Sequence, residues 1–201
     1  MALAARFNLK ISQLDVVTAF LYGDLDEEIY MVQPQGLFED SSLVCKLVKS
    51  LYGLKQASRQ WNHKVNEVLE KFGLDRCEAE QCIYFSMVDD SILFVALYVD
   101  DFLIFSNNPS FEAKLKNCLK NNFKIKDLGE VTSVLGMKMT RNQETGEITI
   151  DQKQYIEKLL ARFGMSDCNS VATPLDVNQR LTVEMCPSNV SERNEIKDVP
   201  F

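Results

Sequence analysis

Residues 92–105 read ILFVALYVDDFLIF, two apolar runs separated by a pair of aspartates. Each run has the length and composition of a buried strand, so the stretch predicts a hairpin of strands 92–99 and 102–105. A two-residue hairpin turn usually contains Asn-Gly or Asp-Gly, because glycine readily adopts a positive φ. Asp100 and Asp101 supply charge instead, which makes this turn a candidate functional site.

The segments on either side complete an α+β fold. Apolar periodicity, capping residues and turn residues predict strand 9–17, helix 58–72, the two central strands, helix 109–122 and strand 131–140. This β-α-β-β-α-β order is that of a split βαβ (ferredoxin-like) antiparallel sheet with helices on one face. We also expect short strands at 29–32, 44–48 and 83–88, a β-hairpin with its second strand at 147–150, and a C-terminal helix between Asp151 and Gly164.

The C-terminal residues have a different composition. From Asp176 onward the chain is polar and lacks large apolar residues at regular spacing. Such a segment cannot bury enough apolar surface to offset the entropy lost on folding. We therefore expect a domain of residues 1–176 and a loose C-terminal tail of residues 177–201.

The expected topology brings three carboxylates together. Strand 102–105 lies between strands 9–17 and 92–99 and is antiparallel to both, so Asp15 at the end of the first strand lies beside Asp100 and Asp101. Carboxylates this close repel one another unless a cation lies among them. Mg²⁺ prefers such oxygen ligands, and two ions roughly 4 Å apart can activate an attacking hydroxyl and stabilise a leaving pyrophosphate.

An ordinary solvated turn is the alternative interpretation of Asp100-Asp101. Asp89-Asp90 offers an internal comparison, because it also follows a valine and separates two expected strands. We interpret that second pair as a simple turn. The expected proximity of Asp15 favours a metal site for Asp100-Asp101 alone.

Composition limits the class of protein. With 46% hydrophobic and 25% charged residues among 201, the chain is globular in composition. The net charge of −7 argues against nucleic-acid binding, which needs Lys and Arg for phosphate contacts. Binding is compatible with this charge if basic residues share one face, or if basic regions lie outside this chain. The candidates for such a face are Lys114, Lys116, Lys120, Lys124 and Lys126.

Features missing from the sequence bear on the cellular compartment and on zinc binding. It has no apolar run long enough to span a bilayer and no signal-peptide pattern at its start, so we expect a soluble intracellular protein. Its six cysteines form no C-x-x-C pair, and His63 is the single histidine, so we expect no zinc site. We expect free, mostly buried thiols.

Several motifs resemble one family. Tyr98-Val99-Asp100-Asp101 is similar to the YxDD box of reverse transcriptases. Residues 14–25 (LDVVTAFLYGDL) resemble the first-aspartate segment of the copia-type enzymes, and residues 50–61 (SLYGLKQASRQW) resemble their SLYGLKQAPRQW segment, with Ser58 in place of the proline. Further similar segments follow in order at 126–130, 135–136, 155–165 and 171–175. The ordered set over about residues 2–176 is far more specific than a YxDD box alone.

The resemblance implies a role for each matching residue. The chain would contain a polymerase palm, part of the fingers and the start of the thumb or connection, acting as an RNA-directed DNA polymerase with two Mg²⁺ or Mn²⁺ ions. Asp15, Asp100 and Asp101 would be the catalytic, metal-binding carboxylates. The nucleotide would contact Val16, Phe20, Tyr52, Gly53, Lys55 and Gln56, with Phe20 excluding a ribose 2′-hydroxyl. The primer would contact Tyr98, Leu135 and Gly136, whereas Trp61 is expected in the helix core.

The resemblance also implies partners and a context. The partners would be an RNA or DNA template-primer, deoxynucleotides and the rest of a Pol polyprotein with integrase and ribonuclease H, without a membrane. The expected location is the cytoplasm, in a virus-like particle, with the nucleus as an alternative. The family's basic fingers segment and ribonuclease H domain are not in these 201 residues, so we expect little activity from the chain alone.

Three other functions stay open at this point. The chain could be a catalytically inactive transposon remnant. It could be an RNA-recognition module on the same sheet, with Tyr98 and Phe105 stacking on bases, although the Lys/Arg-Gly-Phe motif of such modules is missing. It could also be a nucleotide cyclase, which a Gly-Gly-Asp/Glu hairpin would mark in place of Tyr98-Val99-Asp100-Asp101.

Overall fold

A six-stranded antiparallel sheet dominates the computed structural model, which describes residues 1–36, 42–142, 144–172, 178 and 180–197. The chain divides into two units, residues 1–132 with 140–149, and residues 133–139 with 150–201. The six-stranded sheet belongs to the first unit and has the strand order β4-β5-β6-β7-β1-β8. Its strands are β1 (Lys10–Val16), β4 (Asp75–Arg76), β5 (Ile83–Val88), β6 (Ser91–Tyr98), β7 (Asp101–Ser106) and β8 (Ile125–Glu130).

The central strands have the neighbours that the sequence predicts. β7 lies between β6 and β1 and is antiparallel to both. β8 pairs with the other side of β1, also antiparallel, with a register shift between Gln13 and Leu14. As a result, β1 has a paired strand on each side, and its end is fixed by two ladders of hydrogen bonds.

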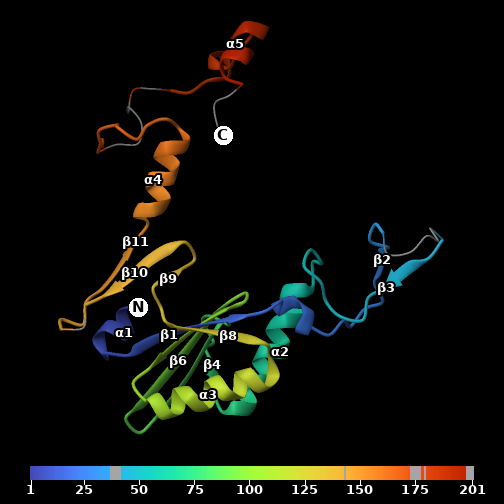
Figure 1. The fold of residues 1–201 in the computed structure, drawn as a ribbon, viewed down its shortest axis with the longest axis vertical. Coiled ribbons are helices and arrows are strands. Elements are labelled where there is room, and N and C mark those ends of the chain that lie inside the picture. Colours follow the sequence, from blue (N-terminus) through green and yellow to red (C-terminus); the bar gives the residue numbers. More distant parts are fainter. Residues whose placement is uncertain (37–41, 143, 173–177, 179, 198–201) are drawn as a thin grey trace. The chain divides into compact units, whose positions relative to one another are not determined.

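Two helices cover one face of this sheet. These are α2 (Ala57–Phe72) and α3 (Pro109–Asn122), both shown across the same side of the strands in Figure 1. The core between helices and sheet includes Leu14, Val16, Trp61, Val65, Leu69, Leu93, Val95, Phe102, Ile104, Leu115 and Leu119. Because side chains alternate along a strand, the residues between these core positions lie on the opposite face of the sheet.

Local signals place the helix ends. Gly73 ends α2 in the left-handed conformation with φ of 98°, which favours glycine. The side chain of Asn108 caps α3 by accepting hydrogen bonds from the backbone N–H groups of Ser110 and Phe111, and Pro109 occupies the first helical position. Both helix ends were predicted from these residues.

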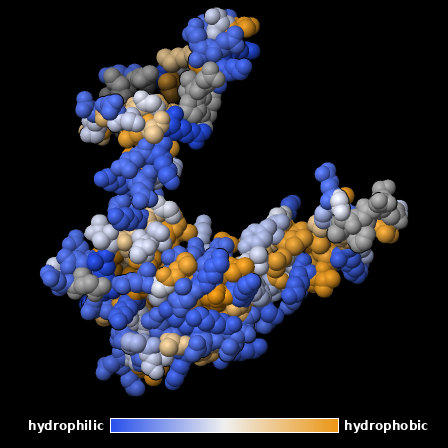
Figure 2. Space-filling view, viewed as in Figure 1, coloured by the Kyte–Doolittle hydropathy of each residue, from blue (hydrophilic) through white to orange (hydrophobic). Residues whose placement is uncertain are grey.

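Short elements complete the first unit. They are α1 (Ala2–Arg6), the 3-10 helix η1 (Ala19–Tyr22), β2 (Tyr30–Val32) and β3 (Val44–Lys46). β2 and β3 form a separate two-stranded antiparallel hairpin. Hydrophobic residues reach the surface near this hairpin, whereas the visible surface of α3 is mostly hydrophilic (Figure 2).

The prediction of one strand over 131–140 is wrong. The structure has β8 before this range, a two-residue strand β9 (Ser133–Val134) and then β10 (Met137–Arg141). Leu135 and Gly136 both have positive φ and form a turn between β9 and β10, which a continuous strand cannot accommodate. β8 was missed because its residues IKDLGE are almost all exposed and show no apolar alternation.

The C-terminal half contains regular structure to near its end. β9 and β10 form a three-stranded sheet with β11 (Ile148–Asp151), and the helix α4 (Lys153–Arg162) follows. The 3-10 helix η2 (Val183–Met185) and the helix α5 (Val190–Glu195) lie in the segment expected to be a loose tail, and their described residues are almost all exposed. Asn189 caps α5 by accepting from the Glu192 N–H. The expected domain boundary at residue 176 lies outside the described residues.

Two further observations concern the chain as a whole. Among the described residues, no helix is long and apolar enough to cross a membrane. All six cysteines are free thiols. The expectation that most are buried is wrong, because Cys45, Cys77, Cys82 and Cys118 are half-buried and Cys168 and Cys186 are exposed.

Candidate active site

Asp15 and Asp101 lie directly opposite each other in the sheet. Asp15 is near the end of β1 and its partner in the register is Asp101, the first residue of β7. Their neighbours Leu14 and Phe102 are buried against the helices, so the two aspartates lie on the other sheet face. Residues opposite each other in an antiparallel pair have Cβ atoms about 5 Å apart. The register therefore places two carboxylates side by side.

Asp100 lies in the turn that precedes β7. Tyr98 pairs with Asp101, so the two turn residues are Val99 and Asp100, and the expected turn Asp100-Asp101 is wrong by one residue. The Asp100 carbonyl accepts a hydrogen bond from the backbone N–H of Val16, with 2.8 Å between nitrogen and oxygen. The backbone of Asp100 is thus attached to the end of β1 immediately beside Asp15.

The turn is strained at Val99. Its φ is 54°, in the left-handed region that β-branched residues disfavour strongly. Strained backbone of this kind occurs often at functional sites. At the opposite end of β6, the turn Asp89-Asp90 has a positive φ of 52° at Asp89, a residue type that tolerates it better. The two Asp-Asp pairs therefore differ in both position and backbone strain.

Other side chains already contact two of the three carboxylates. Gln13 Nε2 donates to Asp101 Oδ1 at 2.9 Å, and Lys126 Nζ lies 3.5 Å from Asp15 Oδ2. Within the described part of the chain, no three His, Cys, Asp or Glu side chains are arranged to hold a metal ion. The oxygen donors fit Mg²⁺ or Mn²⁺ in type and backbone position.

The residues expected to contact a nucleotide fall into two groups. Phe20, in η1, and Tyr52 lie together, with 4.5 Å between the centres of their rings. Phe20 also packs against the core, so its structural and its expected selective role are compatible. Lys55 is exposed, whereas Gln56 donates to Glu27 Oε2 at 3.1 Å and lies at the start of α2.

The residues expected to contact a primer lie in different units. Tyr98 is 59% exposed at the end of β6, where it pairs with Asp101. Leu135 and Gly136 form the turn between β9 and β10 in the second unit, with φ of 50° and 75°. Two adjacent positive φ values are typical of the tight type I′ hairpin turn. Tyr98 therefore lies beside Asp101, whereas Leu135 and Gly136 belong to the other unit.

Trp61 is a functional candidate that sequence reasoning assigned only to the core. It is buried as expected, at 2% exposure, but its indole Nε1–H also donates to the Val99 carbonyl at 2.5 Å. The side chain therefore reaches from α2 to the strained turn. The helical spacing of Trp61 predicts burial, but a bond to a distant backbone carbonyl leaves no signal in the sequence.

Comparison with known proteins decides the family. Residues 1–177 match the family described as "Reverse transcriptase (RNA-dependent DNA polymerase)". The chain is 42% identical over 205 residues to the Pol polyprotein of transposon TNT 1-94 from Nicotiana tabacum, covering all of this chain and 15% of that protein. The chain belongs to the copia-type reverse transcriptase family.

Two further relatives of this reverse transcriptase chain support the assignment. It is 36% identical to the Pol polyprotein of transposon RE1 from Arabidopsis thaliana, over 86% of this chain and 12% of the relative. It is 35% identical to a putative transposon Ty5-1 protein of Saccharomyces cerevisiae, over 81% of this chain and 53% of the relative. The chain thus spans only a small part of the length of the Pol polyproteins that it matches.

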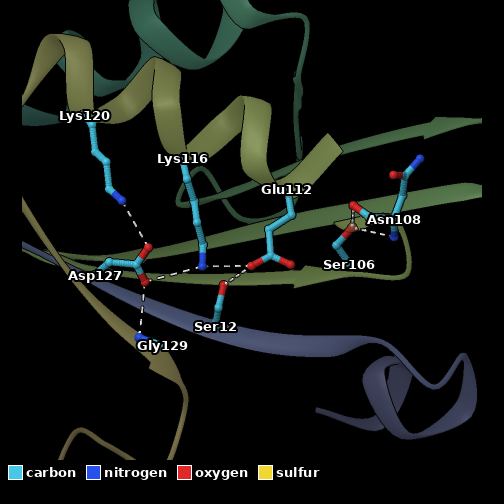
Figure 3. Close-up of polar contacts among 8 residues, drawn as sticks. All are labelled: Ser12, Ser106, Asn108, Glu112, Lys116, Lys120, Asp127 and Gly129. Atoms are coloured by element: carbon cyan, nitrogen blue, oxygen red, sulfur yellow. Dashed lines mark hydrogen bonds and ion pairs between the residues drawn. The ribbon is translucent and has the colours of Figure 1, made fainter. Parts of the chain in front are cut away.

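A polar network on the helix face supports the strand that carries Asp15 in this reverse transcriptase chain (Figure 3). Ser12 Oγ donates to Glu112 Oε1 at 2.7 Å, and Lys116 Nζ lies 2.9 Å from the same oxygen and 3.4 Å from Asp127 Oδ1. Lys120 lies 3.2 Å from Asp127 Oδ2. The network therefore links α3 to both β1 and β8.

Asp127 is the central carboxylate of this network. Its pKa is lowered although burial alone raises it, because the Gly129 N–H and the two lysines stabilise the charged form. Lys116 and Lys120, which we expected on a nucleic-acid-binding face of the reverse transcriptase, are therefore engaged in ion pairs within the fold.

Proposed function

We propose that the six-stranded sheet with α2 and α3 is the palm of an RNA-directed DNA polymerase that adds deoxynucleotides to a primer 3′-hydroxyl. The observation that carries the proposal is the register of Asp15 opposite Asp101, with Asp100 attached to the end of β1. The strand order β6-β7-β1-β8, with both helices on one face, supports the proposal that this sheet is a split βαβ palm.

The three aspartates have separate roles in this proposal. Asp15 and Asp100 bind divalent cations together with the carbonyl of Val16, and Asp101 lies near the primer 3′-hydroxyl. Two Mg²⁺ or Mn²⁺ ions, when bound, supply positive charge that favours loss of the hydroxyl proton and stabilises the leaving pyrophosphate. Lys126 balances part of the negative charge at Asp15, and Gln13 orients the carboxylate of Asp101.

Phe20 and Tyr52 form the sugar side of the proposed nucleotide site. Their contact places two rings beside each other on the segments that follow Asp15 and precede α2. Phe20 excludes a ribose 2′-hydroxyl, and Gly53 and Lys55 complete the floor of the site. Because Phe20 is also packed against the core, its ring is held in place and cannot easily move aside for a larger sugar.

The protein context is part of the proposal. The chain matches a short region of much longer Pol polyproteins. We therefore propose that it functions with integrase and ribonuclease H regions, on RNA or DNA template-primers, within a cytoplasmic virus-like particle.

Primer extension tests the function. The chain, joined to the flanking Pol regions of a relative, should extend a DNA primer on an RNA template when Mg²⁺ is present. Asp100→Asn should reduce extension by about a thousandfold or more, because it removes charge from the proposed metal site. Asp89→Asn in the opposite turn is the matched control and should leave the rate unchanged.

The other outcomes have clear meanings. Equal effects of Asp100→Asn and Asp89→Asn would show that Asp100 belongs to an ordinary turn. In a further outcome, the unsubstituted chain, shown by circular dichroism to be folded, binds template-primer without extending it. That result would favour an inactive nucleic-acid-binding remnant over a polymerase.

A further inference from the structure

We propose that Trp61 is a positioning residue that fixes the direction of the Asp100 side chain through the backbone of the Val99-Asp100 turn. This inference rests on the proposed function of that turn. It concerns a hydrogen bond between a helix and a hairpin that are 38 residues apart in the sequence.

The indole of Trp61 is held rigidly. Trp61 belongs to α2 and packs against the rings of Tyr22 and Phe123, whose centres lie 6.0 Å and 5.0 Å from its own. Tyr22 and Phe123 also contact each other edge to face, at 5.2 Å. The Tyr22 hydroxyl accepts from the Lys124 N–H at 2.7 Å, which fixes that ring in turn. The indole N–H therefore points to the turn from a fixed position.

Close packing fixes the start of α2 against the segment that follows η1. A Cβ atom at Gly23 would lie 2.8 Å from Gln60 Cβ and 3.1 Å from the backbone nitrogen of Trp61. Only glycine permits the segment after η1 to approach α2 this closely. From this same helix the Trp61 side chain reaches the Val99 carbonyl.

The turn needs an external constraint. Val99 has a φ of 54° and is 39% exposed, so neither its residue type nor tight packing of its side chain accounts for this conformation. The equivalent position in the other hairpin is Asp89, a residue type that tolerates such angles. At Val99 the indole hydrogen bond compensates for an unfavourable residue.

Two hydrogen bonds together determine the conformation at Asp100. Trp61 binds the carbonyl of the peptide group before the Asp100 Cα atom, and the Val16 N–H binds the carbonyl of the peptide group after it. When both peptide planes flanking a Cα atom are fixed, its φ and ψ are fixed as well. These two contacts therefore determine the direction of the bond from Cα to Cβ. That direction in turn limits the positions that the Asp100 carboxylate can occupy.

Removal of one hydrogen-bond donor tests the inference. Trp61 is the only tryptophan, so growth with β-(3-benzothienyl)alanine replaces the indole N–H by sulfur at this position alone and keeps the ring shape. Mn²⁺ affinity is measured by water-proton relaxation, and amide hydrogen exchange is followed residue by residue. The analogue should bind Mn²⁺ about threefold to tenfold more weakly and exchange the Val16 amide faster by a similar factor, the loss expected for one hydrogen bond.

The controls separate positioning from packing. Exchange in the β5–β6 ladder should be unchanged in the analogue, and Trp61→Phe should reproduce the weaker Mn²⁺ binding. Unchanged Val16 exchange and Mn²⁺ affinity in the analogue would overturn the inference. Faster exchange in every strand would also overturn it, because it would show that the indole N–H stabilises the fold as a whole.

The same measurements distinguish an error in the proposed metal site from an error in the positioning role of Trp61. If Asp100→Asn leaves Mn²⁺ binding unchanged, Asp100 is not a metal ligand, and the exchange of the Val16 amide alone then decides the role of Trp61 in the turn. If Asp100→Asn weakens Mn²⁺ binding while the benzothienyl analogue does not, the metal site stands and only the positioning role is wrong.

Discussion

At the scale of single residues, Val99 lowers the stability of the fold but restricts the turn before Asp101 to fewer conformations. A valine with φ of 54° is unfavourable, and glycine adopts such angles at no steric cost. We predict that Val99→Gly raises the free energy of unfolding by up to about 1 kcal/mol and weakens Mn²⁺ binding, because the turn then samples more conformations. Urea unfolding and Mn²⁺ titration measure the two effects.

Val88 provides the matched control for this substitution. It precedes the other turn but has a normal strand conformation, so Val88→Gly should lower the free energy of unfolding by roughly 0.5–1 kcal/mol. Equal destabilisation by the two substitutions would contradict the claim that Val99 is strained.

Phe20 is the residue whose role can be tested by substrate choice. In the chain joined to flanking Pol regions, Phe20→Ala should allow incorporation of ribonucleotides, because the ring that collides with the 2′-hydroxyl is removed. Extension with deoxynucleotides and ribonucleotides is compared in parallel. If sugar selection does not change, Phe20 has only its role in the core, where it packs beside Tyr52.

At the scale of elements, the Asp127 network joins α3 to the strands and makes this junction sensitive to pH. The pKa of Asp127 is lowered in the fold, so its contribution to stability is present above the pKa of the unfolded chain and is lost as pH falls through the folded value. Asp127→Asn should therefore destabilise the protein at pH 7 and much less at pH 3.

Urea unfolding at both pH values measures this difference. Asp89→Asn is the control, because Asp89 is an exposed turn residue at the far end of β6. A loss of stability in Asp127→Asn that is the same at both pH values would show that the ionised carboxylate is not what stabilises the junction.

The same elements show what the sequence can predict. Helix α3 was predicted at Pro109–Asn122 because its signals are local, namely a capping Asn, a first-turn Pro and regular apolar spacing. The turn before Asp101 was misplaced by one residue, because its register depends on pairing between strands. β8 was missed because its almost wholly exposed residues carry no apolar alternation, and only its pairing with β1 shows it to be a strand. The gathering of the aspartates was predicted from topology, but Gln13, Lys126 and Trp61 at the site were not.

At the scale of the whole molecule, the C-terminal segment contributes little buried surface. No described residue from 166 to 197 is buried, although η2 and α5 lie there. We predict that removal of residues 166–201 changes the free energy of unfolding of the six-stranded sheet by less than about 0.5 kcal/mol. Urea unfolding followed by Trp61 fluorescence measures it, and a larger loss would show that the segment packs on the rest.

The two outer strands of the six-stranded sheet have a consequence for the behaviour of the chain in solution. An outer strand offers unpaired N–H and C=O groups to which a second copy can add, and this is a common route to aggregation. β8 forms one edge with exposed, charged residues, among them Lys126 and Glu130, and β4 at the other edge is only the pair Asp75–Arg76. Charge on one side and shortness on the other discourage growth of the sheet from molecule to molecule.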